Sequence, residues 1–252
     1  MSDADVWLGG RQVLDGLDLR LDAGEAVAVC GPNGAGKSSA IRAVAGLLAL
    51  RRGIVQLGDD DISRLSERQR AERIAYLPQE RRIAWNMPAI EIAALGAPFL
   101  SAADGLSRAR AALEEVGAGD LASRGVAEMS GGERARVLLA RVLVSGATTL
   151  LVDEPIAGLD PDAQLLVLDR LKARTRTGQT VLASLHDLTL AARWADRVVV
   201  ISQGRVVSEG PPLEALTSDI LRSVFGVSGV WIATPSGPLL DVTRVLESSQ
   251  GA

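Results

Sequence analysis

The segment EAVAVCGPNGAGKSSAIRAVAGLL, residues 25–48, joins an apolar run, a glycine-rich loop and a second apolar stretch with helical spacing. The first run predicts a buried strand, and the residues after the loop predict a helix. Strand, G-x-x-x-x-G-K-S loop and helix in this order are typical of a phosphate-binding loop in a parallel α/β sheet. An accidental lysine in a glycine-rich turn is the alternative, and the flanking strand and helix argue against it.

A loop of this kind binds the phosphates of a nucleoside triphosphate. Its glycines let successive backbone N–H groups face the phosphates at the start of the helix. We expect Lys37 to reach the β- and γ-phosphates and the Ser38 hydroxyl to bind Mg²⁺. The expected phosphate-binding residues are Gly31, Pro32, Asn33, Gly34, Ala35, Gly36, Lys37, Ser38 and Ser39. By itself the loop leaves a kinase, a GTPase and an ATPase open.

Two more apolar runs end in residues suited to acid–base chemistry. TTLLVDEP, residues 148–155, predicts a buried parallel strand with Asp153 and Glu154 at its carboxyl end, where ligands of open α/β sheets bind. We expect Asp153 to hold Mg²⁺ through water and Glu154 to accept a proton from an attacking water. The only histidine, His186, follows the apolar run TVLAS and is expected near the γ-phosphate. A solvated acidic turn and a structural histidine are the alternatives.

A second glycine-rich stretch, MSGGE at residues 129–133, precedes another run with helical apolar spacing. Ser130, Gly131 and Gly132 therefore open a helix, whose first N–H groups and dipole form an anion site. Ser130 and Glu133 also fit the S-x-x-E capping box, in which each side chain bonds the other residue's backbone. The two interpretations are compatible, because the residues can cap the helix in a lone subunit and bind phosphate in a pair.

Composition limits the class of protein. A chain of 252 residues with 47% hydrophobic residues can form one large domain or two closely joined lobes. The net charge of -4, without a basic cluster, argues against a nucleic-acid partner. The acidic start predicts neither signal peptide nor anchor, and residues 84–103 contain Asn86, Glu91 and two prolines, unlike a membrane span. The single Cys30 is expected to pack as a small apolar residue.

Six motifs, GPNGAGKSS, YLPQE, MSGGE, LLVDEP, AGLD and SLHD, resemble in order and spacing those of ATP-binding cassette (ABC) ATPases over nearly the whole chain. The resemblance implies an α/β fold of the P-loop NTPase type. Its parts would be a mainly parallel sheet, an N-terminal antiparallel portion near GIVQLGDDDI and a small helical subdomain. In this arrangement residues 1–252 form one ABC ATPase domain, with 82–128 as the helical subdomain and 229–246 as a C-terminal hairpin.

The resemblance also implies ATP and Mg²⁺ as cofactors and assigns roles to single residues. Lys37 becomes a catalytic residue of the phosphate loop. Gln79, in YLPQE, contacts Mg²⁺ and the attacking water at the hinge to the helical subdomain. Asp153 is then a metal-binding carboxylate, Glu154 the catalytic base and His186 the switch residue at the γ-phosphate.

In such ATPases two copies meet head to tail, and each ATP lies between the phosphate loop of one copy and the signature loop of the other. The stretch Ser130–Gly132 would therefore serve the partner's nucleotide, and Asp160 would lie at the subunit interface. An aromatic residue upstream of the phosphate loop usually stacks on adenine. In this register Leu8 takes its position, with Trp7 next to it, and we expect Trp7 to stack.

The stretches RIAYLPQERRIAW, MSGGERARVLLAR and SLHDLTLAARWADRVVVISQGRVVSEGPP are most similar to the ATPases of importers for iron-siderophore, haem or cobalamin. This implies a subunit bound peripherally at the cytoplasmic face of the bacterial inner membrane. Its partners would be permease subunits, docked on the surface formed by residues 81–96, and indirectly a periplasmic or surface substrate-binding protein.

Several functions remain open at this point. The ATPase of another importer and a soluble non-transport ABC ATPase are alternatives within the family. A small-molecule kinase or GTPase would leave MSGGE and His186 unexplained. The transported molecule itself is not encoded here, because the permease and the binding protein recognise it.

Overall fold

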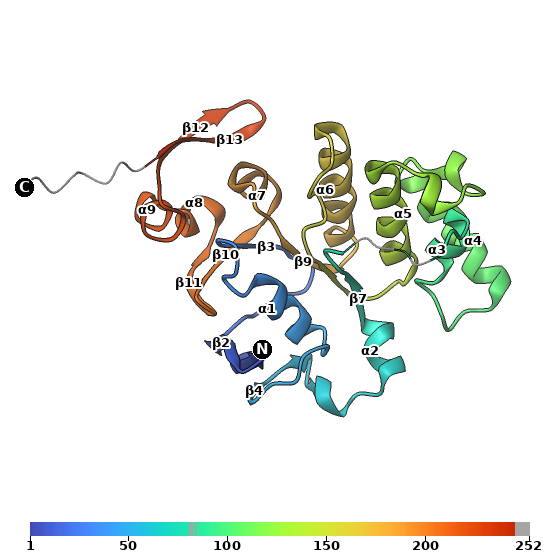
Figure 1. The fold of residues 1–252 in the computed structure, drawn as a ribbon, viewed down its shortest axis with the longest axis horizontal. Helices are drawn as coiled ribbons and strands as arrows, with labels where there is room; N and C mark the ends of the chain where they lie inside the picture. Colours follow the sequence, from blue (N-terminus) through green and yellow to red (C-terminus); the bar gives the residue numbers. More distant parts are fainter. Residues whose placement is uncertain (81–82, 84, 245–252) are drawn as a thin grey trace, which may run out of the picture.

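A six-stranded sheet forms the centre of the molecule (Figure 1). The computed structural model describes residues 1–80, 83 and 85–244. The strand order is β11-β10-β3-β9-β8-β7, and every neighbouring pair is parallel except β10 with β11. The strands are β3 (Ala26–Cys30), β7 (Ile74–Leu77), β8 (Thr149–Val152), β9 (Thr180–Ser184), β10 (Arg197–Ser202) and β11 (Arg205–Gly210). The predicted mainly parallel α/β sheet is therefore confirmed.

The central strand β3 is buried on both faces. Ala26, Ala28 and Cys30 belong to the larger apolar core, together with residues of α5 (Gly131–Val144), α6 (Pro161–Thr175) and α7 (Leu188–Trp194). Val27 and Val29 belong to a second core on the side of α1 (Lys37–Val44). Because alternate residues of a strand face opposite sides, a strand between two cores needs a continuous apolar run. Cys30 packs as a small buried residue, as expected.

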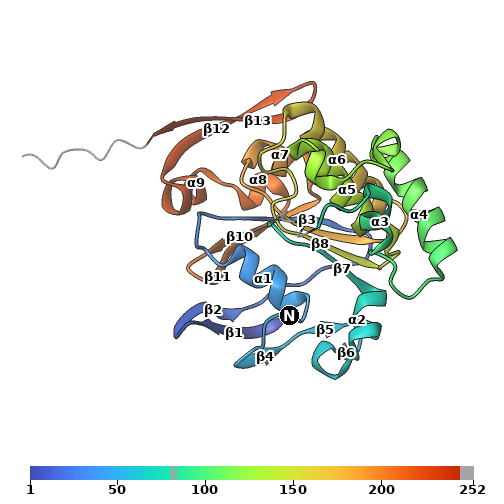
Figure 2. The same cartoon turned by 45° about the vertical axis from the view of Figure 1, so that its right-hand side comes forward.

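An antiparallel layer covers the face of the sheet that carries α1 (Figure 2). Its three-stranded sheet has the order β2-β1-β4, formed by β1 (Ser2–Leu8), β2 (Arg11–Leu17) and β4 (Arg52–Ile54). The short strands β5 (Gln56–Leu57) and β6 (Asp60–Asp61) pair next to it, followed by η1 (Ile62–Arg64) and α2 (Glu67–Arg73). The antiparallel portion predicted near residues 53–62 is present.

A group of helices extends from one end of the sheet (Figure 1). It contains α3 (Ala89–Ala94), α4 (Ala102–Glu115), η2 (Gly119–Leu121) and η3 (Val126–Glu128), and α3 and α4 pack against α5. Of the expected docking surface, Met87 and Ile90 pack partly against the core, whereas Trp85 is 73% exposed. Residues 81, 82 and 84 of that surface lie outside the described residues. None of the helices in the described part has the length and apolarity needed to cross a bilayer.

The chain ends with two helices and a hairpin. These are α8 (Pro212–Ala215), α9 (Ser218–Phe225), β12 (Val227–Thr234) and β13 (Gly237–Arg244). The hairpin packs on α9 and α7, and Trp231 Nε1 donates to the Leu216 carbonyl over 3.0 Å. The hairpin begins two residues earlier than predicted, and the last two residues of the predicted range, 245 and 246, lie outside the described part.

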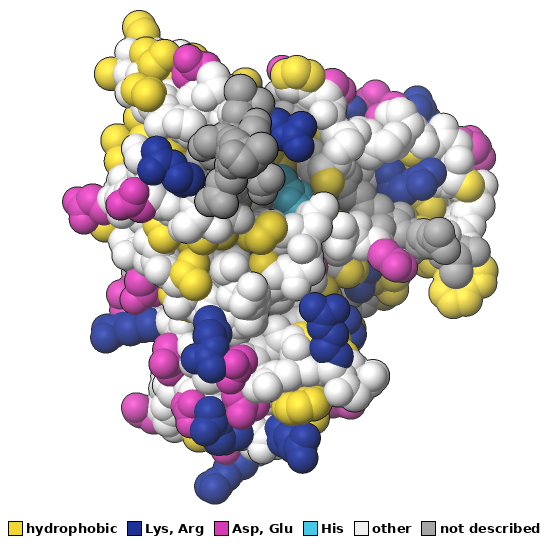
Figure 3. Space-filling view, turned by 60° about the vertical axis from the view of Figure 1, so that its left-hand side comes forward, with side chains coloured by type: hydrophobic (Ala, Val, Ile, Leu, Met, Phe, Trp, Pro, Cys, Tyr) yellow, Lys and Arg dark blue, Asp and Glu magenta, His cyan; other side chains and the backbone are white. Residues whose placement is uncertain are grey.

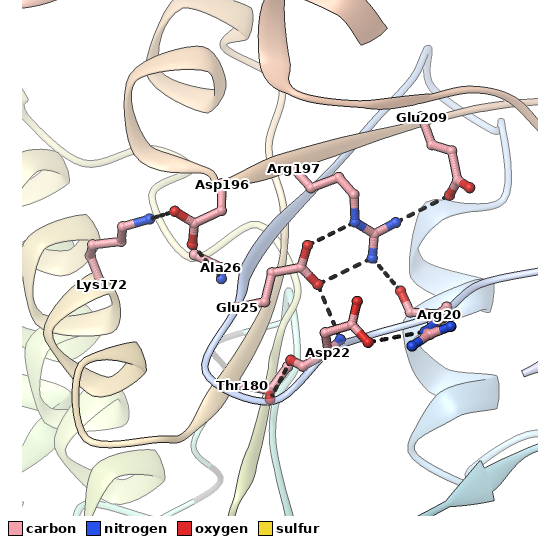
Figure 4. Close-up of polar contacts among 9 residues, drawn as sticks. All are labelled: Arg20, Asp22, Glu25, Ala26, Lys172, Thr180, Asp196, Arg197 and Glu209. Carbon is pink, nitrogen blue, oxygen red and sulfur yellow. Dashed lines mark hydrogen bonds and ion pairs between the residues drawn. The ribbon is translucent and has the colours of Figure 1, made fainter.

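Arg197 joins β10, β11 and the loop that leads into β3 at the amino edge of the main sheet (Figure 4). Its guanidinium contacts Glu25 over 2.7 Å and Glu209 over 3.1 Å, and it also donates to the Arg20 carbonyl. The hydrogen bond to Glu25 is the main cause that raises the pKa of Arg197. The Arg197 and Glu25 side chains are only 18% and 15% exposed. This cluster therefore fixes the entry of β3 against β10 and β11.

We predict that Arg197→Met lowers the free energy of unfolding by about 1.5–3 kcal/mol, because charge-assisted hydrogen bonds of the nearly buried Glu25 are lost. Chemical denaturation at neutral pH measures this. The matched control is Arg20→Met, which removes an ion pair to Asp22 whose side chains are 84% and 58% exposed, and it should change stability by less than about 1 kcal/mol. Equal effects of the two substitutions would contradict a structural role for Arg197.

Candidate functional site

A cleft of about 1150 Å³ opens at the carboxyl edge of the main sheet. Figure 3 shows the single histidine of the chain, in cyan, reaching the surface on this side. The residues that line the cleft come mainly from the ends of β3, β7, β8, β9 and β10. They are Arg11, Gln12, Val13, Pro32, Asn33, Gly34, Ala35, Gly36, Lys37, Ser38, Ser39, Gln79, Glu154, His186, Ser202, Gln203, Gly204, Ser223 and Val224.

The strand register brings the separate sequence motifs together. In the parallel ladders Val29 lies opposite Ser184, Val152 opposite Ala183, and Leu77 opposite Val152. The segments that follow these strands therefore leave the sheet at the same edge. This explains how the phosphate loop, Gln79, Glu154 and His186 reach one cleft from distant parts of the chain.

Glycines allow the loop after β3 to press against its neighbours. Gly31 has a φ of 151°, and a Cβ there would lie 2.1 Å from the Ile201 carbonyl oxygen. Gly36 has a φ of 111°, and a Cβ there would lie 2.9 Å from the Val13 carbonyl oxygen. A side chain at either position would force the backbone apart, so the loop can wrap around the start of α1 only with glycine at these positions.

Lys37 begins α1 and is almost completely buried. Its ammonium donates hydrogen bonds to the carbonyl oxygens of Gly31, over 2.8 Å, and Pro32, over 3.1 Å. Burial lowers the pKa of Lys37, and the nearby charge of Glu154 opposes this shift. The two carbonyls hold the ammonium over the loop, where a phosphate group could replace them as its partner.

The acidic pair at the end of β8 is tied to β9. Asp153 is 2% exposed, and its Oδ1 accepts a hydrogen bond from the Ser184 hydroxyl over 2.6 Å. The Glu154 N–H donates to the same hydroxyl over 2.7 Å. Glu154 has a φ of 50°, which is unusual for a residue with a side chain. Ser184 is the first residue of the motif SLHD, but no role was expected for it from the sequence. A serine that ends an otherwise apolar strand is a signal that could have marked it.

His186 contacts the side chain of Glu154 directly. Its Nε2 lies 2.5 Å from Glu154 Oε1, and the two side chains are 43% and 13% exposed. Because a carboxylate can only accept, Nε2 donates in this contact when Glu154 is ionised. Nε2 can therefore donate to a water molecule or a phosphate oxygen only after this contact with Glu154 opens.

The glycine-rich stretch MSGGE lies at the start of α5 and outside the cleft of its own subunit. The predicted capping box is confirmed: the Glu133 N–H donates to Ser130 Oγ, and the Ser130 N–H donates to the Glu133 carboxylate. The second bond is the main cause that lowers the pKa of Glu133. The N–H groups of Gly131 and Gly132, in the first turn, have no acceptor within the helix.

Neither Trp7 nor Leu8 lines the cleft. The Arg51 guanidinium instead lies over the Trp7 ring, 5.1 Å from its centre. The sequence motifs also miss several lining residues, including Arg11 in β2 and Val224 in α9. Arg11 pairs with Leu8 in the β1–β2 hairpin. Because Leu8 takes the position expected to contact adenine, this pairing could have indicated that Arg11 lines the cleft.

Oxygen donors suited to a hard cation lie around the cleft. The Ser38 hydroxyl and the Gln79 amide line it, and the carboxylate of Asp153 is buried beside Glu154. Within residues 1–80, 83 and 85–244 there is no group of three or more His, Cys, Asp or Glu side chains that could hold a metal ion by itself. This donor set fits Mg²⁺, which usually takes one or two protein oxygens and completes its shell with phosphates and water.

Comparison with known proteins agrees with the motifs. The family described as ABC transporter matches residues 14–157. The hemin import ATP-binding protein of Myxococcus xanthus is 42% identical over 93% of this chain and 92% of its own length. The protein of the same name from Bordetella pertussis is 40% identical over 91% and 92%. Among solved structures, the ATP-binding subunit of an ABC transporter superposes with a TM-score of 0.76 at 30% identity, covering 88% of this chain and 90% of that one.

Proposed function

Because this chain belongs to the ABC transporter family, we propose that it is the ATP-hydrolysing subunit of a bacterial importer for haem. The observation that carries the proposal is the cleft, which gathers the phosphate loop, Glu154 and a histidine at one sheet edge. Haem as the substrate is supported by the similar proteins from Myxococcus xanthus and Bordetella pertussis, which are named as hemin import ATP-binding proteins. An importer for an iron chelate or cobalamin is the alternative within the same group.

In this proposal the phosphate loop binds ATP. Backbone N–H groups of residues 31–39 surround the phosphates at the start of α1, and Lys37 exchanges its carbonyl partners for phosphate oxygens. Ser38, Gln79 and Asp153 would hold Mg²⁺, which neutralises charge on the phosphates when it is bound. For the adenine ring, Arg11 is a candidate because it lines the cleft, whereas Trp7, the candidate from the sequence, lies outside the cleft with the Arg51 guanidinium over its ring.

Glu154 is the proposed general base. Its carboxylate accepts a proton from the attacking water, and His186 donates a hydrogen bond to the γ-phosphate region. The short Glu154–His186 contact supports this assignment, because it places both side chains at the same point of the cleft. When ATP binds, the Nε2 proton would turn from Glu154 to a phosphate oxygen. As the water oxygen bonds to the γ-phosphorus, its proton passes to Glu154. The bond between the γ-phosphorus and the β–γ bridging oxygen breaks, and ADP leaves with that oxygen.

We further propose that two copies form a head-to-tail homodimer. Ser130, Gly131 and Gly132 lie at an exposed helix start outside the cleft of their own subunit. First-turn N–H groups at such a position suit the γ-phosphate of ATP bound to the partner. Asp160, which caps the start of α6, is proposed to lie at the same interface.

The remaining partners follow from this function. Permease subunits would dock on residues 81–96, where the exposed Trp85 supports a contact, and a substrate-binding protein would act on the outer side of the permease. The chain would thus lie peripherally on the cytoplasmic face of the inner membrane, without a nucleic-acid partner. Residues 82–128 are proposed as the helical subdomain and 229–246 as the hairpin.

Transport in proteoliposomes tests the substrate. The chain, purified with its permease subunits, should drive ATP-dependent movement of haem, and the Glu154→Gln variant of the complex should not. Ferric siderophore and cobalamin, supplied at the same concentration, serve as competitors. Transport of either of these without haem would reject the haem proposal. A chain that hydrolyses ATP and binds no membrane protein would instead be a soluble non-transport ABC ATPase.

We predict that Glu154→Gln keeps ATP affinity but lowers turnover by roughly 10²- to 10⁴-fold, the usual contribution of a positioned base. Phosphate release and nucleotide titration measure the two quantities. Glu214→Gln, the same change on an exposed side chain of α8, should leave both unchanged. Size-exclusion chromatography of the Glu154→Gln variant with ATP and Mg²⁺ should show a dimer, whereas a monomer with normal turnover would remove Glu154 from this role.

A mixing experiment tests whether the Ser130 loop acts on the partner's nucleotide. Ser130→Ala should lower the free energy of unfolding by about 0.5–2 kcal/mol, because the helix loses its cap. A folded but inactive variant is therefore attainable. Lys37→Ala should be inactive because phosphate binding is lost. If the loops act across the interface, a mixed dimer of the two variants has one composite site with both lesions and one site with neither.

The measurement is the nucleotide trapped per mixed dimer, using a slowly hydrolysed ATP analogue. We expect one intact site in each mixed dimer and none in the two parent dimers. If each loop served its own subunit, every site would carry one lesion. Occupancy at the parental level, after mixing has been proven, would contradict the head-to-tail proposal.

A further inference from the structure

A single buried hydroxyl connects the two acidic residues of the site. Ser184 is fully buried at the end of β9, and its Oγ takes part in two hydrogen bonds of 2.6 and 2.7 Å. The directions of these bonds are unambiguous. The Glu154 N–H can only donate, so Oγ accepts from it, and the one hydroxyl proton is left for Asp153 Oδ1.

The hydroxyl is not needed to hold the strand itself. The backbone of β9 is paired on both sides, with β3 and with β8. Ser184 lies opposite Val29 in the β3 ladder, which fixes its position without the side chain. The hydroxyl instead connects this paired strand, by its two hydrogen bonds, to Asp153 and Glu154 in the turn after β8, where the chain leaves the sheet.

That turn contains an unfavourable backbone conformation. Glu154 has a φ of 50°, and a residue with a side chain keeps such a conformation only where its surroundings hold it. The bond from the Glu154 N–H to Ser184 Oγ acts on this residue. At the same time, the bond to Asp153 Oδ1 restricts rotation of that carboxylate and does not involve Oδ2.

We propose that Ser184 is a positioning residue that sets the direction of both acidic groups: the Asp153 carboxylate through its side chain and the Glu154 carboxylate through its backbone. Ser184 does not touch the nucleotide, since it is fully buried and does not line the cleft. It acts on the metal through Asp153 and on the attacking water through Glu154. This inference rests on the ATPase function proposed above.

The test compares two hydroxyl deletions on the same strand. Ser184→Ala removes the link to the acidic pair. Thr180→Val removes a buried hydroxyl at the opposite end of β9, where Thr180 Oγ1 donates to the Asp22 carbonyl over 2.9 Å. Ser184→Thr keeps a hydroxyl at the critical position. All three are made in the full chain and checked for folding by circular dichroism.

Two readouts separate positioning from a general loss of stability. The first is the affinity for Mn²⁺, measured by electron paramagnetic resonance with a slowly hydrolysed ATP analogue. The second is the division of the effect between kcat and KM for ATP. For Ser184→Ala we expect Mn²⁺ binding that is about 10- to 100-fold weaker, or a kcat that is lower by the same factor, as for other residues that orient a metal-binding carboxylate. KM should change little, because the phosphate loop is intact.

Thr180→Val should lower stability and leave both readouts at the wild-type level, and Ser184→Thr should recover most of what alanine loses. Wild-type values for Ser184→Ala in both readouts would overturn the proposal, as would equal losses in Ser184→Ala and Thr180→Val. If Ser184→Ala does not fold, Ser184→Cys takes its place, because a thiol fills the site but hydrogen-bonds weakly.

The two proposals fail in different ways. If the wild-type chain does not hydrolyse ATP, the proposed function is wrong, and the Mn²⁺ titration still tests the action of Ser184 on Asp153. If the wild-type chain hydrolyses ATP and the Ser184→Ala variant matches it in Mn²⁺ affinity and kcat, only the positioning role is wrong.

Discussion

The parallel pairing of β3 with β9, and of β9 with β8, is the constraint on which the rest of the structure depends. It ends three buried strands at one edge of the sheet, so that each delivers its next residues to the same place. No local sequence feature brings together the phosphate loop, the acidic pair and His186. The cluster around Arg197 supports this arrangement from the opposite edge, where it fixes the entry of β3 beside β10.

The site contains buried charge, which the surrounding structure must compensate. Lys37 is 5% exposed and Asp153 is 2% exposed. Removing such groups from water is unfavourable unless hydrogen bonds replace those of the solvent. Two loop carbonyls do this for Lys37, and the Ser184 hydroxyl does it in part for Asp153. Two apolar cores, one on each face of the sheet, provide the stability that makes this local cost tolerable.

The start of α5 shows how one sequence motif can serve stability and binding together. The capping box uses the N–H groups of Ser130 and Glu133, while those of Gly131 and Gly132 belong to the first turn and need an acceptor from outside the helix. Glu133 is further held by Arg124 over 3.0 Å. A helix start that is already rigid can receive a phosphate without first being ordered, which reduces the entropy lost on binding.

The resemblance of six ordered motifs indicated the fold class, and the sequence alone determined the local elements and their chemistry: the strand–loop–helix around Lys37, the apolar strand before Asp153 and the capping box at Ser130. These follow from periodicity, glycine spacing and side-chain type, which act over a few residues. Tertiary structure decided the rest. The register of β8 and β9 placed Ser184 under the acidic pair, and the packing of β2 and α9 brought Arg11 and Val224 into the cleft while Trp7 stayed outside. Such contacts join residues far apart in the chain, so no local pattern records them.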